Sequence, residues 1–230
     1  MRILITGASR GLGLYLATHF AEQGHTVVGC ARSASELTHE RYRHMQFDAT
    51  DETALNTAMA EIRRDYGGLD ALINNAGTAG MVPIALTPVG KARDILNVNF
   101  LSTFVCTRAA VRLLRASDNA RIVNMSSVAV PLRLDGEAVY AAAKSAIETF
   151  TRISAREFGP WGITCNAVGP SPVRTNLLRG VPEEKLDALI QRQSIPEWAT
   201  PADVANAVDF FLRPESRMVT GQVLYLGGIA

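Results

Sequence analysis

The sequence predicts an α/β fold in which a parallel β-sheet is covered by helices on both faces. Short apolar runs, rich in β-branched residues, alternate with longer helical patterns along the whole chain, and a glycine-rich turn joins the first run to the first helix. Such alternation indicates βαβ units with right-handed crossovers, and therefore a doubly wound sheet. The 230 residues are 47% hydrophobic and contain no linker, repeat or low-complexity tract, so we expect one domain over 1–230.

Seven strands and the helices between them follow from this pattern. The strands are expected at 2–6, 26–30, 45–47, 71–74, 121–125, 163–168 and 222–226. The main helices are expected from about Leu12 and at 52–66, 91–115 and 138–158. The strands are apolar nearly throughout, as strands buried on both faces are. The irregular stretch 171–200, which carries one short helical pattern, is predicted to be a lid over the substrate.

Composition argues against several classes of partner. The formal net charge is +1 and no Lys/Arg cluster stands out, so we expect no nucleic acid. The start "MRILITGASRG" enters an apolar strand at once and lacks the features of a signal peptide or membrane span, which favours a cytoplasmic protein that does not bind membranes. Cys30, Cys106 and Cys165 lie far apart in apolar contexts, as reduced buried thiols do, and we expect no metal.

The turn after the first strand, "TGASRGLGLYL", has the pattern of a phosphate-binding loop. Gly7, Gly11 and Gly13 would let the backbone approach a pyrophosphate, and the following helix would offer free N–H groups and the positive end of its dipole. A plain tight turn is the alternative. The strand before it and the helix after it favour nucleotide binding.

The end of the second strand, "GCARS", favours a phosphorylated cofactor. Domains that select the unphosphorylated ribose usually have an acidic residue near this point, whereas this chain has Ala31 and Arg32. Arg32, with Arg10 and Ser33, could pair with a ribose 2′-phosphate, so we expect NADP(H). A solvated surface arginine is the alternative.

A tyrosine and a lysine lie four residues apart in the alanine-rich run "AVYAAAKSA". In a helix Tyr140 and Lys144 would share one face among small neighbours. An ammonium group beside a phenol lowers the pKa of the phenol and makes it a usable proton donor and acceptor. The alternative is a tightly packed helix with Tyr140 in the core and Lys144 extending to solvent.

Seven segments in order resemble one known family over essentially the whole chain. They are "TGASRGLG" (6–13), "FDAT" (47–50), "NNAG" (74–77), "NVN" (97–99), "SS" (126–127), Y-x-x-x-K (140–144) and "GPSPVRT" (169–175). Together they resemble the short-chain dehydrogenase/reductase family, with the greatest similarity to 3-oxoacyl carrier-protein reductases. The resemblance implies a single Rossmann-type domain with a seven-stranded parallel sheet in the order 3-2-1-4-5-6-7.

The resemblance also implies four catalytic residues. Tyr140 would be the proton donor to a ketone oxygen, while Lys144 would lower its pKa and hold the nicotinamide ribose. Family spacing puts the serine that binds the substrate carbonyl thirteen residues before the tyrosine, which favours Ser127 over Ser126. Asn99 would bend its helix and hold a water of the proton relay; an ordinary amide on the helix surface is the alternative.

The cofactor contacts implied by the resemblance come from several segments. Asp48 would contact adenine, the segment 75–77 the adenosine ribose, and Thr175 the carboxamide of the nicotinamide. The full expected set is Gly7, Ser9, Arg10, Gly11, Leu12, Gly13, Arg32, Ser33, Asp48, Asn75, Ala76, Gly77, Tyr140, Lys144, Pro170, Val173 and Thr175.

The function implied is NADPH-dependent reduction of a ketone to a secondary alcohol, the substrate being a small carbonyl compound such as a 3-oxoacyl or polyketide-like ketone. Two alternatives are an NADP-dependent alcohol dehydrogenase that works in the oxidising direction and a non-catalytic NADPH-binding regulatory protein. The helices 91–115 and 138–158 resemble the faces on which such proteins form homodimers and homotetramers. Arg133, Arg174 or Arg179 could meet an anionic substrate group, or could be exposed loop arginines.

Overall fold

Seven parallel strands form one sheet in the order β3-β2-β1-β4-β5-β6-β7. They are β1 (Arg2–Thr6), β2 (Thr26–Ala31), β3 (Tyr42–Gln46), β4 (Ala71–Asn74), β5 (Arg121–Met125), β6 (Thr164–Gly169) and β7 (Val223–Tyr225). The computed structural model describes residues 1–175 and 181–229. The predicted fold class and strand order are confirmed.

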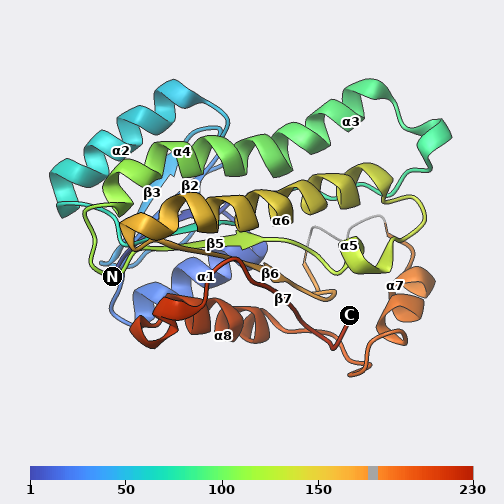
Figure 1. Cartoon of the computed structure of the whole chain (residues 1–230). Helices are drawn as coiled ribbons and strands as arrows, with labels where there is room; N and C mark the ends of the chain where they lie inside the picture. The colour runs from blue at the N-terminus through green and yellow to red at the C-terminus, as the bar shows by residue number, and fades with distance from the viewer. Residues whose placement is uncertain (176–180, 230) are drawn as a thin grey trace.

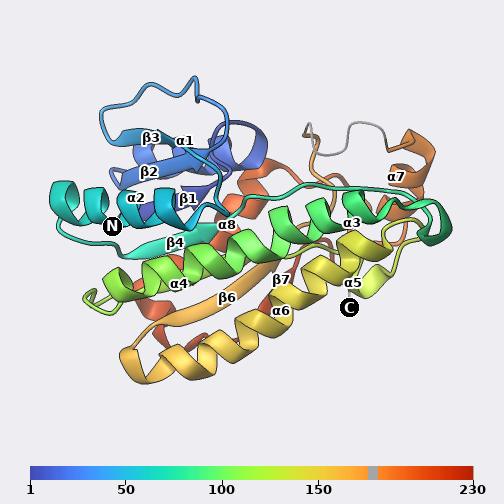
Figure 2. The same cartoon turned by 90° about the horizontal axis from the view of Figure 1, so that it is seen from above.

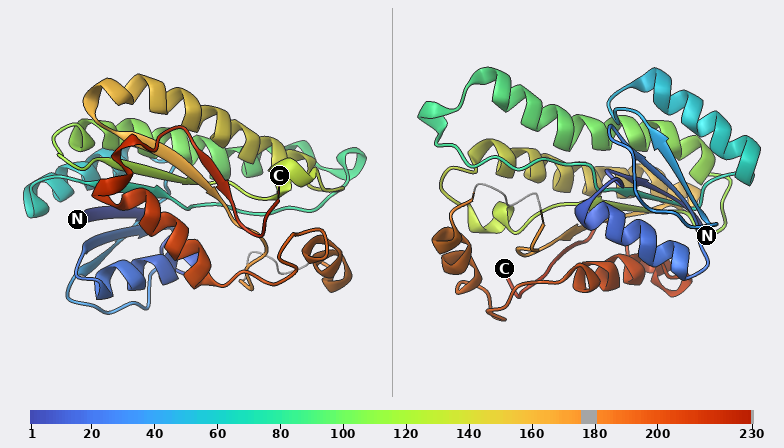
Figure 3. Two further views of the ribbon diagram at one scale, coloured as in Figure 1. Left: turned by 60° about the horizontal axis from the view of Figure 1, so that its bottom comes forward. Right: turned by 180° about the vertical axis from the view of Figure 1, so that it is seen from behind.

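Helices cover both faces of the sheet, as Figures 1 and 3 show. One face carries α1 (Gly11–Glu22) and α8 (Pro201–Leu212), and the other carries α2 (Glu52–Tyr66), α4 (Ser102–Leu114) and α6 (Ala138–Phe158). The shorter helical segments are η1 (Ile84–Leu86), α3 (Val89–Leu96), η2 (Asn97–Leu101), α5 (Ala129–Leu132), η3 (Gly159–Trp161), α7 (Glu183–Ile190) and η5 (Pro214–Met218).

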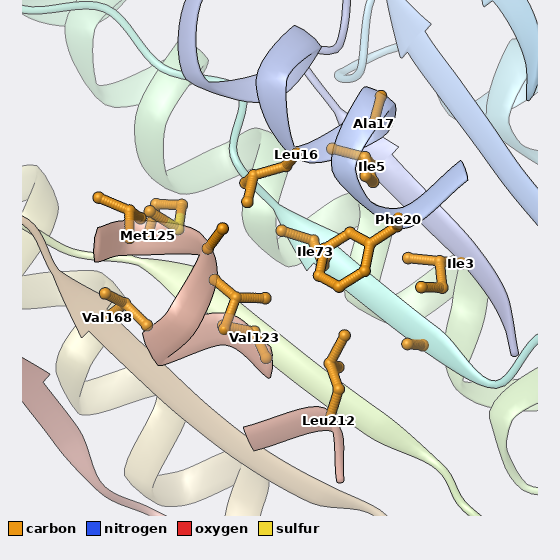
Figure 4. Close-up of a cluster of buried hydrophobic side chains, with 14 of the residues drawn as sticks. Ile3, Ile5, Leu16, Ala17, Phe20, Ile73, Val123, Met125, Val168 and Leu212 are labelled. Carbon is orange, nitrogen blue, oxygen red and sulfur yellow. The ribbon is translucent and has the colours of Figure 1, made fainter. Parts of the chain in front are cut away.

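Alternation along the strands divides the core into two layers. Ile3 and Ile5 of β1 pack with Phe20 of α1 on one face, where Figure 4 shows them together. Leu4, between them in the sequence, packs on the other face with the helices α2 and α4. Because successive side chains of a strand point to opposite faces, an uninterrupted apolar run such as "RILIT" supplies both layers at once.

Two elements differ from the sequence-based expectation. The helix expected at 91–115 is interrupted by the π-helical turn η2 between α3 and α4. Strand β3 spans 42–46 rather than 45–47, because Arg43 and His44 pair with β2 in register although they are not apolar. An edge strand is only half covered, so it tolerates polar residues that hide it from an apolar pattern.

The carboxyl ends of the strands lie at one end of the molecule. In Figures 1 and 2, α5, α7 and the start of α3 gather there, opposite the N-terminus. The strand order reverses between β1 and β4, so the loops after these strands leave in opposite directions and open a crevice.

Candidate functional site

A cleft of about 1040 Å³ lies along the carboxyl ends of the strands. All of the site residues expected from the sequence line it, and residues that are far apart in the chain thus share one cavity. They are Gly7, Ser9, Arg10, Gly11, Leu12, Gly13, Arg32, Ser33, Asp48, Asn75, Ala76, Gly77, Asn99, Ser127, Tyr140, Lys144, Pro170, Val173 and Thr175.

The glycine turn at one end of the cleft is built without room for side chains. Gly7 has a φ of 70°, in the left-handed region, and an added Cβ would lie 2.9 Å from the Ala76 backbone. A Cβ on Gly13 would collide with the Gly7 carbonyl and with the Asn75 amide. Asn75 Nδ2 itself donates to the Thr6 carbonyl at 3.0 Å, which ties the turn to the loop after β4.

Helix α1 begins at this turn with no side-chain hydrogen bond at its N-cap, Arg10. Its first backbone N–H groups and the positive end of its dipole are therefore available to an anion. A narrow turn without side chains, an uncapped helix N-terminus and an adjacent arginine fit a dinucleotide pyrophosphate.

Positive charge also marks the side of the cleft at the end of β2. Arg32 is exposed there, and within 1–175 and 181–229 neither Arg32 nor Arg10 lies within ion-pair distance of a carboxylate. Asp48 lies after β3, where its Oδ1 accepts hydrogen bonds from the Thr50 N–H at 2.9 Å and the Thr50 hydroxyl at 2.8 Å. This turn fixes Asp48 on the wall of the cleft.

Tyr140 and Lys144 occupy successive turns of α6 and are both buried. Lys144 Nζ lies 5.8 Å from the centroid of the Tyr140 ring and donates to the Met125 carbonyl at 2.8 Å. Burial lowers the pKa of Lys144 to about 8. Burial also raises the pKa of Tyr140 to about 12, although a hydrogen bond with Ser127 opposes this.

The expectation of a lowered tyrosine pKa is therefore wrong for this structure. Removal of the phenol from water disfavours phenolate, and Lys144 is itself partly discharged by burial, so it does not reverse that effect. The phenol stays protonated at neutral pH.

The two adjacent serines have different surroundings. Ser127 lies close enough to Tyr140 to oppose the rise of its pKa, and its Oγ accepts from the Ala129 N–H at 3.1 Å, at the start of α5. Ser126 is buried and its hydroxyl is used in a hydrogen bond to Glu148 Oε1 at 2.6 Å. Ser127 is thus the serine beside the phenol.

Asn99 sits inside the π-helical turn η2 and is fully buried. Its Nδ2 donates to the Thr78 carbonyl at 2.9 Å and to the Ile95 carbonyl at 2.8 Å, and its Oδ1 accepts from the Thr78 N–H at 3.3 Å. A surface amide, the alternative considered above, is excluded. The wider turn frees the Ile95 carbonyl from its α-helical partner and gives Asn99 a contact to the loop after β4.

A ladder of buried polar side chains beneath the cleft was missed by the sequence analysis. Asn74 Nδ2 donates to Asn124 Oδ1 at 2.8 Å and to Thr107 at 3.0 Å, and Asn124 Nδ2 donates to Thr151 at 2.8 Å. These bonds connect β4 and β5 to α4 and to α6, the helix that carries Tyr140 and Lys144. Only a three-dimensional arrangement reveals such a ladder, since nothing in its spacing is distinctive.

The predicted lid spans 171–200, and its described parts, 171–175 and 181–200, contribute residues to the cleft wall. An isolated bridge joins Val173 to Ala199. Between them, helix α7 adds Lys185 to the cleft wall, and Arg192 follows just after that helix. The sequence pattern predicted this helix but not which of its side chains would face the cavity. Arg179 lies outside the described residues.

None of the described helices combines the length and hydropathy needed to cross a lipid bilayer. Within 1–175 and 181–229, no three His, Cys, Asp or Glu side chains gather into a group that could hold a metal ion.

The fold and the site define a class of protein: a doubly wound nucleotide-binding domain whose cleft also holds a tyrosine, a serine and a lysine. Residues 7–228 match the family model described as enoyl-(acyl carrier protein) reductase. The chain is 31% identical to the 3-oxoacyl-[acyl-carrier-protein] reductase FabG of Vibrio cholerae, with 98% of this chain and 95% of the relative covered. It is 32% identical to the gluconate 5-dehydrogenase of Gluconobacter oxydans, with 99% and 93% covered.

Solved structures agree. The aldohexose dehydrogenase of Thermoplasma acidophilum superposes with a TM-score of 0.90 at 27% identity, over 99% of this chain and 93% of the other. A 4-hydroxyisoleucine dehydrogenase complexed with NADH superposes with a TM-score of 0.87 at 25% identity, over 100% and 98%. The chain belongs to the short-chain dehydrogenase/reductase family. It is an oxidoreductase of the CH–OH/C=O pair that uses a nicotinamide cofactor.

Proposed function

We propose that this protein reduces a ketone to a secondary alcohol with NADPH, with Tyr140 as the proton donor. The observation that carries the proposal is that Tyr140, Ser127 and Lys144 line the same cleft as the glycine turn and Arg32. A non-catalytic NADPH-binding protein would not need two neighbouring hydroxyl donors beside a buried lysine.

In this mechanism the chain supplies orientation, hydrogen-bond donors and the proton, and NADPH when bound supplies the hydride. The Ser127 and Tyr140 hydroxyls donate to the carbonyl oxygen and stabilise the negative charge that develops on it. The phenol proton then moves to that oxygen. Because the pKa of Tyr140 is raised to about 12, the phenol carries a proton at neutral pH and can donate it to the carbonyl oxygen.

Lys144 and Asn99 act behind the tyrosine. Lys144 is tied to the Met125 carbonyl and would offer its remaining N–H groups to the nicotinamide ribose. Asn99 Oδ1 would lie 2.9 Å from a Cβ on Gly77, and Lys144 Nζ 3.6 Å from it, so both groups converge on the bare backbone of Gly77. Asn99 keeps this corner rigid and supports the proton relay through Lys144.

The test is NADPH oxidation by the wild type and Tyr140→Phe over a panel of ketones and 3-oxoacyl thioesters. Loss of one oxyanion donor that is also the general acid is expected to lower kcat by about 10²–10³-fold or more. NADPH affinity, measured by cofactor fluorescence, is expected to stay within about twofold of the wild type. Undiminished turnover by Tyr140→Phe would refute the assignment.

The preference for NADPH over NADH rests on Arg32, with help from Arg10 and Ser33. We expect Arg32→Ala to weaken NADPH binding by about 10–100-fold, the loss of one or two charge-assisted hydrogen bonds, and to change NADH binding little. Titration of both cofactors with both proteins measures this. Equal affinity of the wild type for NADH and NADPH would contradict the preference.

Assembly into a homodimer or homotetramer is part of the proposal. Leu101 and Phe104 of the η2–α4 segment and Ile153 of α6 are exposed, and Phe104 stacks edge-on against Phe150 across the two helices. A paired apolar face of this kind suits a two-fold interface between copies. Phe104→Glu should shift the protein to a smaller species in light scattering. A cytoplasmic location stays a prediction.

A further inference from the structure

One arginine beside the proposed catalytic residues has an unusual backbone. Arg133 follows α5, in the loop between Ser127 and Tyr140, with φ 51° and ψ 55°. Among the residues that the structure describes, it is the only one other than glycine with a positive φ. Left-handed backbone is unfavourable for a side chain of this kind, and such conformations concentrate at binding sites.

The same short helix fixes both Ser127 and Arg133. Ser127 Oγ accepts from the Ala129 N–H at 3.1 Å, and the Arg133 N–H donates to the Ala129 carbonyl at 3.1 Å. The backbone of Arg133 therefore has a fixed position relative to Ser127, the serine that would bind the ketone oxygen.

Arg133 lines the cleft, and its side chain makes no hydrogen bond or ion pair with the residues that the structure describes. No carboxylate lies within 4.0 Å of it in the part of the chain that the structure describes. Arg174 is the contrast: its guanidinium lies 4.1 Å from the centroid of the Trp198 ring and 3.8 Å from Glu183, and it does not line the cleft. Of the candidate arginines Arg133 and Arg174, only Arg133 is available to a ligand in the cleft.

The other charges on this part of the wall balance one another. Lys185 of α7 and Arg192, just after that helix, line the cleft, as do Asp135 and Glu137. Burial raises the pKa of the Glu137 carboxyl, while the positive charge of Lys185 lowers it. Two cations thus face two carboxyl groups, and the positive charge of Arg133 is left in excess.

We propose that the substrate is a ketone that carries a carboxylate and that Arg133 binds this carboxylate. This inference rests on the proposed ketone reduction and names its substrate class. The flat guanidinium matches the two oxygens of a carboxylate. The left-handed backbone then serves to hold the guanidinium toward the cleft.

The test uses 5-oxohexanoate and its methyl ester, which are matched in length and differ in charge. The wild type with NADPH is expected to show at least a tenfold higher kcat/KM for the acid, chiefly through a lower KM. In Arg133→Gly the ratio of the two kcat/KM values is expected to fall to about one, and Arg133→Lys should lie between. Glycine suits the left-handed backbone, so misfolding would not explain the result.

Arg174→Gln is the matched control, because it removes an arginine that does not line the cleft, and it should keep the acid preference. Equal kcat/KM for acid and ester in the wild type, or an undiminished preference in Arg133→Gly, would overturn the inference while leaving ketone reduction intact. Absence of Tyr140-dependent turnover with every ketone, neutral ones included, would instead overturn the proposed function.

Discussion

Burial has opposite outcomes for two sets of ionisable side chains, one around Asp70 at the amino end of the sheet and one around Lys144 at the carboxyl end. At the amino end, Asp70 accepts hydrogen bonds from the Arg2 backbone N–H at 2.7 Å, from the Arg2 guanidinium at 2.6 and 3.0 Å, and from Ser117 at 2.7 Å. Burial disfavours the ionised carboxylate, but these bonds outweigh it and lower the pKa of Asp70 to about 2. The charge there is fully paired within the fold.

At the carboxyl end, burial is not offset in this way. It lowers the pKa of Lys144 to about 8 and raises that of Tyr140 to about 12, so each group is shifted toward its neutral form. Arg133 keeps a left-handed backbone and has no carboxylate partner among the described residues.

Charged groups that stabilise this domain and charged groups that are available for function lie at opposite ends of the sheet. Asp70 and the groups that donate to it at the amino end satisfy one another and contribute to the free energy of unfolding. In the cleft, burial shifts Lys144 and Tyr140 toward their neutral forms and Arg133 has a left-handed backbone, which lowers stability but leaves these groups available to substrate and cofactor. Substitutions of Asp70 and of these cleft residues should therefore have effects of opposite sign.

The largest effect is expected for Lys144→Met, which should be inactive and yet more stable. Turnover should fall at least about 100-fold, because the cofactor and the proton relay lose a donor. At pH 7 the free energy of unfolding should rise by about 1–3 kcal/mol, because methionine fills the site without a buried charge. This figure allows for the loss of the hydrogen bond from Lys144 to the Met125 carbonyl. Urea denaturation of the apoenzyme measures it.

The pH dependence provides the control for this prediction. The folded pKa of Lys144, about 8, lies below the unfolded value near 10.5, so the unfolded chain binds more protons between these values. The free energy of unfolding of the wild type should therefore rise as pH increases from 8 to 10.5, while that of Lys144→Met lacks this contribution. The difference in free energy of unfolding between the two proteins should narrow over this range. A difference that stays constant over this range would show that burial of charge is not its cause.

Asp70→Asn should destabilise the protein and leave activity unchanged. The amide cannot accept all four hydrogen bonds, and its NH₂ group would face the donors of Arg2, so we expect a loss of about 1–2 kcal/mol. The stabilisation from Asp70 is fully present above about pH 4 and is lost as pH falls through about 2. The variant should lose this part of the acid dependence in thermal melts, and a wild-type-like melting temperature at pH 7 would contradict the prediction.

The fold could be predicted from sequence because its core signal is local. Runs such as "RILIT" are apolar on both faces, and the helices 52–66 and 138–158 begin and end where the pattern predicted. The errors arose where local patterns mislead. The edge strand β3 carries Arg43 and His44, and the π-helical turn at Asn99 keeps a helical periodicity while it changes the hydrogen bonding.

The residues of the site could be predicted from the sequence, but their pKa values and charged neighbours could not. Motif spacing brought Gly13, Ser127 and Tyr140 to one cleft, because parallel strands end at one edge. The direction of the Tyr140 pKa shift was missed, since it depends on burial that spacing does not report. Glu137 and Lys185 were missed for the same reason: which side of a short helix or loop faces a cavity depends on tertiary packing.

The smallest effect tests the strain at Arg133 alone. Arg133→Gly should raise the free energy of unfolding by about 0.5–1 kcal/mol, because the left-handed conformation costs an L-residue about 1–2 kcal/mol and part of that gain is lost to the greater freedom of glycine when unfolded. For a domain of this size such a change raises the melting temperature by about 1–4 °C. Arg133→Ala removes the same guanidinium without relieving the backbone and should not stabilise. Equal stabilisation by glycine and alanine would show that the side chain, not the backbone, carries the strain.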